Sequence, residues 1–543
     1  MAAGLQAEAI VLVVIPMASV IFDEKALCEL MGKKLPAAEL REKIDMLGMP
    51  VDDYADGKFS LDITPNRIDL LSVEGMARAL ASFTGTKKGL REYKAEPSGM
   101  KLEIDRSVRG ARPYIVMAYV KDANLTEELL LSLINIQEKI HDTFGRHRRK
   151  VSIGLHDADT VKAPFTYKAV KEFTFTPLEF ERPMTIAQIL KEHPKGKDYA
   201  HLVQPGKYPM LLDSDAEVLS FPPIINGTIT MLTPQTKNLL IDVTGTSEWA
   251  IRDALNVLCC LLADRGAKIF SIETTDGITP DLAPRTMKFD YKKCNRLLGL
   301  ALTETETAEN LSRMGHEYKA GTVRSPCYRS DLMHWVDIAE DIAIAFDYNK
   351  MPQTLPSFSS IARPLPDLSE VREALLGLGY SQAISWTLTN AELNFTKLCL
   401  PAEKMANAIN PLTTEFTSLR THLLPALLTI LSQNTHHQMP QKIFELGAVF
   451  DKDGHESSEL CCASEHAAAS FSEAKSSVEA LLLELGEQCK LVPKDFPFLA
   501  PGRACAVIHK GKEAGWVGEV REDVRRNFGL ELPVAVFSLR LWQ

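Results

Sequence analysis

The sequence lacks the features that would assign it to several specialised classes of protein. Its ten cysteines include no CxxC pair, so neither a zinc site nor a disulfide framework is indicated. The apolar stretch from Ala9 to Ile21 is too short to span a bilayer, contains Pro16 and follows no basic segment. The formal net charge of −10 shows no excess of basic residues. We therefore expect reduced thiols, a cytoplasmic protein without a membrane partner, and contact with nucleic acid only where it is local or shared with another subunit.

The length of the chain predicts several domains. One hydrophobic core does not extend over 543 residues, so about three to five domains of ordinary size are expected. The stretch 86–100 is rich in Lys, Glu, Gly and Pro and the stretch 352–366 is rich in Pro, which is typical of linkers. The expected divisions are an N-terminal extension (1–16), an α/β domain (17–95), a mixed domain (100–273), a compact α+β domain (278–352) and a larger α+β domain (360–543).

Capping residues and hydrophobic spacing predict several elements. Asp23 is suited to cap a helix that ends at Gly32, and Pro36 opens a second helix whose Leu40 and Ile44 share one face. The further expected elements are a strand at 114–120, helices at 127–144 and 247–262, and strands at 504–509, 514–520 and 534–541 that suggest an antiparallel sheet.

A cluster of carboxylates lies in the segment 329–348. Ser330 or Asp331 is predicted to cap a helix with an apolar stripe, which leaves Asp337, Glu340 and Asp341 at spacings i, i+3 and i+4 on the opposite side. Like charges at this spacing repel, and a divalent cation would reverse the sign of that interaction. Hard oxygen ligands suit Mg²⁺. The other interpretation is a solvated acidic face, stabilised near the helix N-terminus by the helix dipole. The predicted stripe is Leu332, Trp335, Val336, Ala339, Ile342 and Phe346.

Four stretches, in order along the chain, carry a family resemblance. They are LDITPNRIDLLSVEGMARAL (61–80), VLSFPPIINGTITMLTPQTKNLLIDVTGT (218–246), YRSDLMHWVDIAEDIA (328–343), and NPLTTEFTSLRTHLLPALL (410–428) with IFELGAVF (443–450). Together they resemble the β subunit of phenylalanyl-tRNA synthetase in its archaeal/eukaryotic form, over nearly the whole chain from about Met17. One such motif would be weak evidence, but four in the right order are strong. Residues 1–16 have no counterpart, so Met17 is predicted to be the initiator.

The resemblance implies a multidomain α+β fold and a set of partners. It makes 100–273 an editing domain of the tRNA-binding B3/B4 type, 278–352 a Mg²⁺-binding domain of the B5 type, and 360–543 a class II synthetase-like antiparallel-sheet domain. The implied partners are the α subunit, in an α2β2 tetramer, and tRNA(Phe), with ATP used by the complex. The family's Mg²⁺ ligands, at a site that can be shared with the partner subunit, match Asp331, Asp337, Glu340 and Asp341.

The resemblance also implies that the chain removes tyrosine from mischarged tRNA(Phe). An apolar pocket rejects an isostere with one extra hydroxyl by only about 10², whereas a pocket that hydrogen-bonds the hydroxyl discriminates far better. The implied editing pocket assigns Leu211 to its shape, Ser220 and Asn226 to positioning of substrate or water, and Asp242, which is read as ending an apolar strand, to recognition of the phenol or orientation of the ester. The other interpretation of these polar residues is ordinary turn or cap chemistry.

Two further motifs lie in the same region. SIGLHDADTV (152–161) brings together His156, Asp157 and Asp159, either as a general base with its orienter or as a polar turn, and the turn is the favoured interpretation. GRHRRK (145–150) is the one dense basic patch, suited to a tRNA backbone or to a solvated loop.

The C-terminal region lacks the motifs that amino-acid activation requires. Neither GxGxGxxR nor a convincing fRxE occurs after Pro366, and IFELG retains Glu445 without the arginine of that motif. We therefore expect no aminoacylation site in this chain, which would pack against a catalytic α subunit. Two competing hypotheses remain, a free-standing metal-dependent hydrolase built on the carboxylate cluster and a non-catalytic tRNA-binding scaffold.

Overall fold

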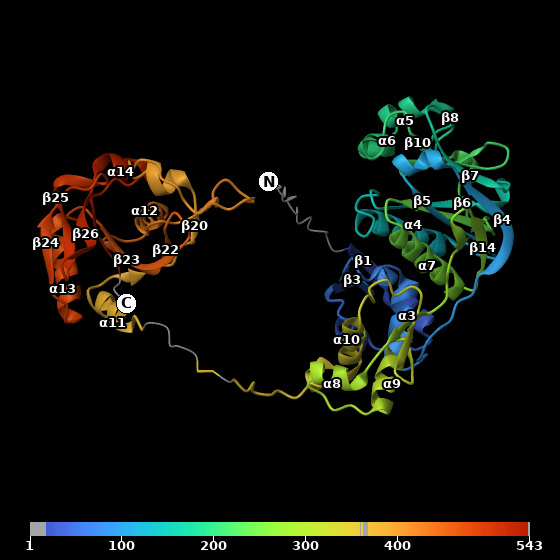
Figure 1. Cartoon of the computed structure of the whole chain (residues 1–543), viewed down its shortest axis with the longest axis horizontal. Helices are drawn as coiled ribbons and strands as arrows, with labels where there is room; N and C mark the ends of the chain where they lie inside the picture. Colours follow the sequence, from blue (N-terminus) through green and yellow to red (C-terminus); the bar gives the residue numbers. More distant parts are fainter. Residues whose placement is uncertain (1–17, 359, 362–366, 541–543) are drawn as a thin grey trace, which may run out of the picture. The chain divides into compact units, whose positions relative to one another are not determined.

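The computed structural model describes residues 18–358, 360–361 and 367–540, which form two compact units (Figure 1). The first unit extends to Leu355 and the second begins at Pro356, within the predicted linker 352–366. The predicted N-terminal extension and the predicted start at Met17 lie outside the described residues. The finer division into five parts stays a prediction. Among the described residues, no helix has both the length and the apolar character needed to cross a membrane.

The first unit begins with a three-stranded antiparallel sheet in the order β1–β3–β2. Asp23 caps helix α1 by accepting a hydrogen bond from the backbone N–H of Ala26, and Gly32 ends the helix in the left-handed conformation, as predicted. Leu40 and Ile44 of α2 are buried on one face, also as predicted. The bounds are β1 Ala18–Asp23, α1 Glu24–Met31, α2 Ala37–Met46, β2 Val51–Ala55, β3 Lys58–Ile63, η1 Ile68–Leu70 and α3 Val73–Phe83.

A ten-stranded mixed sheet follows, in the order β12–β11–β10–β7–β4–β14–β5–β13–β6 with β15 beside β14. The predicted strand at 114–120 and helices at 127–144 and 247–262 are confirmed as β5, α4 and α7. The linker predicted at 86–100 is wrong in its last part, because β4 begins at Glu96 and pairs in parallel with β14. The bounds are β4 Glu96–Ile104, β5 Tyr114–Lys121, α4 Glu127–Asp142, β6 Val151–Asp157, β7 Phe165–Val170, β10 Tyr208–Leu212, β11 Val218–Phe221, β12 Ile225–Asn226, β13 Leu239–Gly245, α7 Glu248–Asp264, β14 Lys268–Thr274 and β15 Gly277–Thr279.

The two ends of this sheet come together. Asn226 on the end strand β12 donates from Nδ2 to the carbonyl of Leu155 on the opposite end strand β6, at 3.3 Å. Arg148, just before β6, donates to the carbonyl oxygens of Pro223 and Ile224 in the turn between β11 and β12, at 3.3 and 3.0 Å. Edge strands expose unpaired backbone groups, and these contacts cover part of both edges. The curled sheet therefore encloses a space between its two ends.

The last part of the first unit packs three helices beside a small antiparallel sheet in the order β16–β18–β17. Helix α10 begins at Trp335, four residues later than Asp331, because His334 and Asp337 form its capping box. The predicted cap and stripe are therefore partly wrong: Val336 is exposed, and Asp341, expected on the solvent side, is buried. The bounds are β16 Arg285–Lys288, α8 Tyr291–Leu298, α9 Glu304–Arg313, β17 Glu317–Lys319, β18 Thr322–Ser325 and α10 Trp335–Phe346.

Buried polar contacts join these parts of the first unit. Asp264 at the end of α7 accepts from Arg78 Nη1 of α3 at 2.6 Å and from the hydroxyl of Tyr93 at 2.9 Å. The guanidinium of Arg78 also stacks 3.7 Å above the ring of Tyr328. Because each partner is satisfied, these groups tolerate burial and hold distant segments together.

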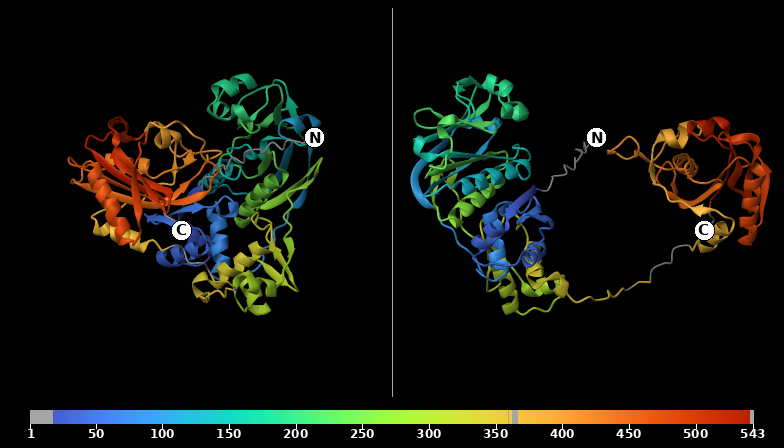
Figure 2. Two further views of the ribbon diagram at one scale, coloured as in Figure 1. Left: turned by 60° about the vertical axis from the view of Figure 1, so that its left-hand side comes forward. Right: turned by 180° about the vertical axis from the view of Figure 1, so that it is seen from behind.

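The second unit, coloured from orange to red in Figure 2, is built around a β-sheet. This sheet has seven strands in the order β19–β22–β23–β27–β26–β25–β24. Residues alternate between its faces: Cys461 and Ala463 pack with α12, and Leu460 and Cys462 pack with α11 and α13. The three C-terminal strands pair antiparallel, which confirms that prediction for the described residues. The bounds are α11 Ser369–Gly377, β19 Ser381–Gln382, α12 Leu424–Gln433, β22 Gln441–Phe450, β23 Glu456–Glu465, α13 Phe471–Glu484, β24 Cys489–Pro493, β25 Leu499–His509, β26 Lys512–Val520 and β27 Val534–Arg540.

Glu459 is a buried carboxyl group on β23, an inner strand of this sheet. It accepts hydrogen bonds from the hydroxyl of Ser538 and from the backbone N–H of Leu423. Burial penalises the charged form, and it raises the pKa of Glu459 to about 7 despite these hydrogen bonds. The stability of the second unit is therefore expected to depend on pH.

The Glu459→Gln variant of the second unit should gain stability relative to wild type as the pH rises. The folded pKa lies above the ordinary value, so wild type loses stability as the pH rises through this window, whereas an amide does not titrate. Between about pH 5.5 and about pH 8 the difference in unfolding free energy should shift by roughly 2 kcal/mol toward the variant. Hydrogen exchange of β23 amides in the intact chain measures it.

Glu456→Gln, at an exposed position of the same strand, is the matched control and should show no such shift. A pH-independent difference between Glu459→Gln and wild type would contradict the prediction.

Candidate active site and acidic cluster

A cavity of about 420 Å³ lies between the two ends of the ten-stranded sheet. Its walls come from α4, β6, the end of β11, and the chain from β12 to Leu232. Cavities of this size are typical of small-ligand sites. Of the four predicted pocket residues, Ser220, Asn226 and Asp242 line it, whereas Leu211 does not. Leu211 lies on β10 directly opposite Ser220 and is fully buried in the core below the cavity wall.

Ser220 and Asn226 present polar atoms at the cavity wall. They face each other in the register of β11 and β12. The Ser220 side chain is only 2% exposed, and its hydroxyl oxygen has no hydrogen-bond partner among the described residues. Buried hydroxyls without a partner are uncommon in folded proteins, so this atom is suited to a ligand or a bound water. Asn226 uses its amide nitrogen to hold β6, which leaves its side-chain oxygen available.

Asp242 lies in the middle of β13, so the prediction that it ends the strand is wrong. Its Oδ2 is 2.7 Å from Nε2 of His156, and Nδ1 of His156 is 2.8 Å from the hydroxyl of Thr230. The favoured interpretation of His156 as part of a polar turn is also wrong, because His156 is a fully buried residue of β6. The turn begins at Asp157, whose carboxylate accepts from the N–H of Asp159. His156 and Asp242 therefore form a buried pair at the cavity wall.

The basic segment 145–150 is partly a structural element of the cavity. Arg148 is buried, and besides its two bonds to the β11–β12 turn it donates to Glu138 of α4 at 2.9 Å. Close contact with His141, whose Nδ1 lies 3.4 Å from Glu138 Oε1, and the charge of Arg148 lower the pKa of Glu138 to about 2, so this carboxylate stays ionised at neutral pH. Neither expectation for the segment, tRNA contact or solvated loop, describes Arg148. Sequence reasoning missed Glu138 and Arg148 because nothing local links them to a turn near residue 223.

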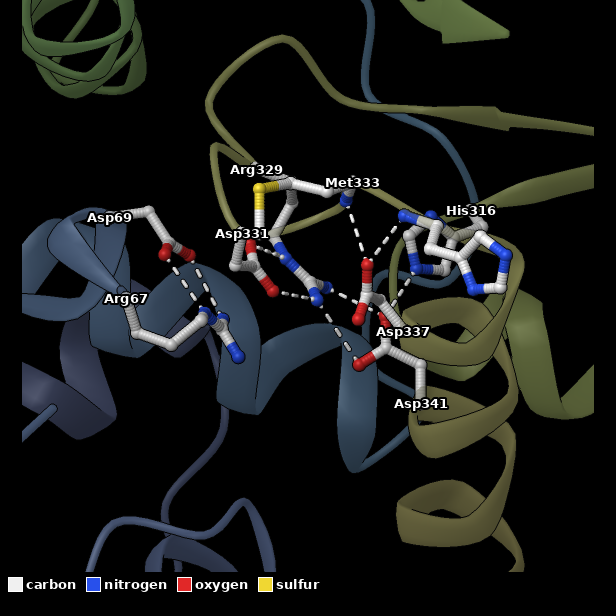
Figure 3. A network of polar contacts seen from close by, with 9 residues as sticks. Arg67, Asp69, His316, Arg329, Asp331, Met333, Asp337 and Asp341 are labelled. Atoms are coloured by element: carbon white, nitrogen blue, oxygen red, sulfur yellow. Dashed lines mark hydrogen bonds and ion pairs between the residues drawn. The ribbon is translucent and has the colours of Figure 1, made fainter. Parts of the chain in front are cut away.

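The acidic cluster of the first unit is organised around one guanidinium (Figure 3). Arg329 forms a bidentate pair with Asp331, at 2.8 and 2.7 Å, and lies 2.9 Å from Asp341 Oδ2. The same Asp341 oxygen is 2.7 Å from Nε2 of His316. Burial would raise the pKa of Asp341, but Arg329 and His316 outweigh it and lower the pKa below its ordinary range. Two of the four predicted metal ligands are thus already neutralised by protein cations.

The other two carboxylates lie differently. Asp337 Oδ2 accepts from the backbone N–H groups of Met333 and His334, which satisfies the start of α10, and Glu340 is exposed. Among the described residues, no group of three or more His, Cys, Asp and Glu is arranged to hold a metal ion. As they stand, the four carboxylates do not fit a shared Mg²⁺ site. Asp337 Oδ1 and both Glu340 oxygens have no hydrogen-bond or ion-pair partner among the described residues.

The first and third sequence motifs meet beside this cluster (Figure 3). Arg67 pairs with Asp69 through two hydrogen bonds of 2.9 Å, and both side chains are buried. Burial raises the pKa of Asp331, but Arg329 and, more weakly, Arg67 reverse this and lower it. Arg67 of the first motif and Arg329 of the third, about 260 residues apart in the chain, therefore both favour the charged form of Asp331.

Glu445 in the second unit does have an arginine partner. Arg420, from the fourth sequence motif, places Nη1 at 2.7 Å from Glu445 Oε1, and both side chains are buried. The IFELG motif around Glu445 contains no arginine, and the sequence did not predict this partner from a different part of the chain. The pair holds the end of one loop against β22 and is internally neutralised.

Comparison with known proteins assigns the family. The model of the phenylalanyl tRNA synthetase beta chain CLM domain matches residues 351–541, and that of the tRNA synthetase B5 domain matches residues 287–348. The phenylalanine–tRNA ligase beta subunit of Archaeoglobus fulgidus is 41% identical, over 92% of this chain and 94% of its own length. The corresponding subunit of Methanococcus maripaludis is 38% identical, over 92% and 96%.

A solved structure agrees with these relatives. An N-terminal fragment of the phenylalanyl-tRNA synthetase beta subunit from Pyrococcus horikoshii matches with a TM-score of 0.58 and 37% identity, covering 61% of this chain and 99% of the fragment. The order of motifs, the α+β architecture and the coverage of nearly the whole chain agree. The chain belongs to the phenylalanine–tRNA ligase beta subunit family.

Proposed function

We propose that this chain is the β subunit of a cytoplasmic phenylalanine–tRNA ligase and that its 420 Å³ cavity hydrolyses mischarged Tyr-tRNA(Phe). In this proposal an α subunit attaches phenylalanine to tRNA(Phe) with ATP, and the β subunit binds tRNA and proofreads. The observation that carries the editing proposal is the cavity wall itself, where the unpartnered hydroxyl of Ser220 and the carboxylate of Asp242 face a space suited to one amino-acid side chain.

The polar groups of the cavity suit a phenol better than a phenyl ring. A tyrosyl hydroxyl can donate to the carboxylate of Asp242 and accept from the hydroxyl of Ser220. A phenylalanyl group would displace water from both groups and leave them unpaired, which costs about 1–3 kcal/mol for each. This asymmetry favours tyrosine in the editing cavity, the reverse of the preference that an aminoacylation site needs.

Asn226 is placed to act on the ester. Its amide nitrogen is held by Leu155, so its side-chain oxygen has a fixed position at the cavity wall. An oxygen of this kind can accept a hydrogen bond from the attacking water and orient it toward the ester carbonyl. No titratable base is required for this role, since an aminoacyl ester is already an activated bond.

Asn226→Ala should reduce deacylation of Tyr-tRNA(Phe) by about 10² or more, because positioning of the reacting water is lost. EDTA should leave the rate within about twofold, because the cavity needs no metal for water positioning. The measurement is release of labelled tyrosine by the full chain in complex with its α subunit.

The two competing functions predict different results. A metal-dependent hydrolase would lose activity with EDTA and keep it in Asn226→Ala, and a non-catalytic scaffold would release no tyrosine at all. Either outcome would reject the editing proposal. Thr233→Ala, outside the residues that line the cavity, is the matched control.

The second unit offers a candidate surface for the α subunit. Several large apolar side chains are exposed, including Trp386 at 78%, and the ring of Trp386 packs edge-on against Phe416. Exposed apolar side chains in this number are typical of protein interaction surfaces. The candidate surface is centred on Trp386 and Phe416, and the exposed large apolar residues of the segment 384–416 are Ile384, Trp386, Leu388, Ile409, Leu412 and Phe416. The lack of activation motifs in this unit supports a partner that carries the aminoacylation site, in an α2β2 assembly.

Replacing Ile384 and Trp386 together by Ser should weaken binding of the α subunit by about 10² or more, since a buried Trp is often a hot spot. Sedimentation of the mixed subunits measures the effect, and aminoacylation of tRNA(Phe) should fall in parallel. Leu483→Ser, an 80% exposed apolar residue on α13, is the control. Equal binding by the double variant and the control would exclude this surface.

Magnesium is the second proposed component. Mg²⁺ usually keeps several waters and takes one or two carboxylates from the protein. We assign that role first to Asp337, through its Oδ1, and to Glu340, with remaining ligands from water or the partner subunit. The prediction for Asp331 and Asp341 stands only if Mg²⁺ displaces Arg329. The support is the match to the B5 family model and the open oxygens of these two side chains.

In the complex, Mg²⁺ should raise the unfolding temperature of wild type by a few degrees and have no effect on the Asp337→Asn/Glu340→Gln variant, because a ligand stabilises only the state that binds it. Differential scanning calorimetry with Mg²⁺ and with EDTA measures this. Glu309→Gln on α9 is the control. An equal Mg²⁺-dependent shift in wild type and the double variant would contradict the assignment.

A further inference from the structure

We infer that His156 is a positioning residue that fixes the carboxylate of Asp242 for recognition of a tyrosyl phenol. The inference rests on the proposed editing function and deepens it. His156 is fully buried and bridges two residues of the cavity wall, Asp242 through Nε2 and Thr230 through Nδ1, at 2.7 and 2.8 Å. His156 is not one of the four pocket residues predicted from the sequence.

Gly154 explains why Asp242 reaches His156. In the register of β13 and β6, Asp242 lies directly opposite Gly154, and His156 is two residues further along the same face of β6. A Cβ atom on Gly154 would lie 1.9 Å from Asp242 Oδ2 and 2.7 Å from His156 Nε2. Only glycine leaves the space through which the Asp242 carboxylate crosses β6 to the imidazole. The same space would let the carboxylate turn if nothing held it.

The pair leaves one oxygen of Asp242 for a ligand. Oδ2 is engaged by His156, whereas Oδ1 has no hydrogen-bond partner among the described residues, and Asp242 belongs to the cavity wall. A carboxylate with one oxygen fixed by an N–H donor has a defined orientation for the other oxygen. A phenol hydroxyl donates best along that direction. His156 thus determines where the acceptor for the phenol lies.

Thr230 fixes the opposite edge of the imidazole ring. Its hydroxyl contacts His156 Nδ1 and also lies 3.2 Å from the carbonyl oxygen of Gly227. A hydroxyl can donate to one neighbour and accept from the other, so both ring nitrogens have a partner. With both edges held, the ring cannot flip, and Nε2 stays directed at Asp242. Gly227, Thr230 and Asp242 line the cavity, so the buried His156 links residues of the cavity wall from behind.

The alternative is that the His156–Asp242 pair has only a structural role. A second buried His–Asp pair in the same chain serves as a comparison. His316 and Asp341 form a second buried pair with the same Nε2–Oδ2 distance of 2.7 Å. Neither residue lines the 420 Å³ cavity. Removing either histidine should cost stability, because it leaves a buried carboxylate with one partner fewer. Only the loss of His156 should change which amino acid is hydrolysed.

The test uses the full chain in complex with its α subunit and compares single-turnover deacylation of Tyr-tRNA(Phe) and Phe-tRNA(Phe). In His156→Phe the ratio of the Tyr-tRNA(Phe) rate to the Phe-tRNA(Phe) rate should fall by at least about tenfold, which corresponds to the loss of a typical hydrogen bond to a charged group. His156→Gln, whose amide nitrogen reaches about the position of Nε2, should keep the ratio within about threefold. His156→Asn reaches only the Nδ1 position and should behave like Phe.

The controls separate positioning from folding. His316→Phe should lower the unfolding temperature and leave the ratio unchanged, because a structural defect slows both substrates together. If His156→Phe does not fold, Thr230→Val decides, with an expected fall in the ratio of about threefold or more. A wild-type ratio in His156→Phe or, failing that, in Thr230→Val would overturn the inference, as would equal loss in the Gln and Phe variants. No tyrosine release by wild type would instead reject the proposed function.

Discussion

The register in which β13 pairs with β6 is the constraint on which the candidate site depends. It sets Asp242 opposite Gly154 and Leu240 opposite His156, so that the carboxylate and the imidazole share one face of the sheet. Because side chains alternate between faces, a slip of one residue would move Asp242 to the face covered by α4 and α7. The apolar residues Leu239, Ile241 and Val243 prevent that slip, since they are buried on that helix-covered face.

Closure of the sheet then turns this face into a cavity. The contacts of Asn226 with Leu155, and of Arg148 with the turn after β11, join the two end strands. Each uses a polar side chain to satisfy backbone groups that an open sheet would expose to water. The cavity is therefore a consequence of how the sheet ends meet. It takes its chemical character from the few polar side chains left at that junction.

Buried charges elsewhere in the first unit follow a related rule. Each buried arginine is neutralised by carboxylates: Arg78 by Asp264 and Arg329 by Asp341 from other segments, and Arg67 by Asp69 and Arg329 by Asp331 from two residues away. Such pairs add little net stability compared with apolar packing, but breaking one is costly, so the pairs of Arg78 with Asp264 and of Arg329 with Asp341 specify which segments meet. This explains why two of the four carboxylates that look like a metal cage in the sequence, Asp331 and Asp341, are committed to arginine and histidine in the structure.

The sequence by itself determined much of the local structure and the family. Caps such as Asp23 and Gly32, the β5 strand and the α4 and α7 helices follow from near-neighbour spacing, which is local information. Ser220, Asn226 and Asp242 were reached through the family resemblance.

Only the tertiary structure decided that His156 joins Asp242 and Thr230, that Arg148 holds the turn near residue 223, and that Arg329 occupies the acidic cluster. His156 is 86 residues from Asp242 and 74 from Thr230, Arg148 is 76 residues from Ile224, and Arg329 is 12 residues from Asp341. The sequence carries no local signal for these pairs. Their pairing is set by strand register and by burial, which makes an unpaired charge too costly to keep.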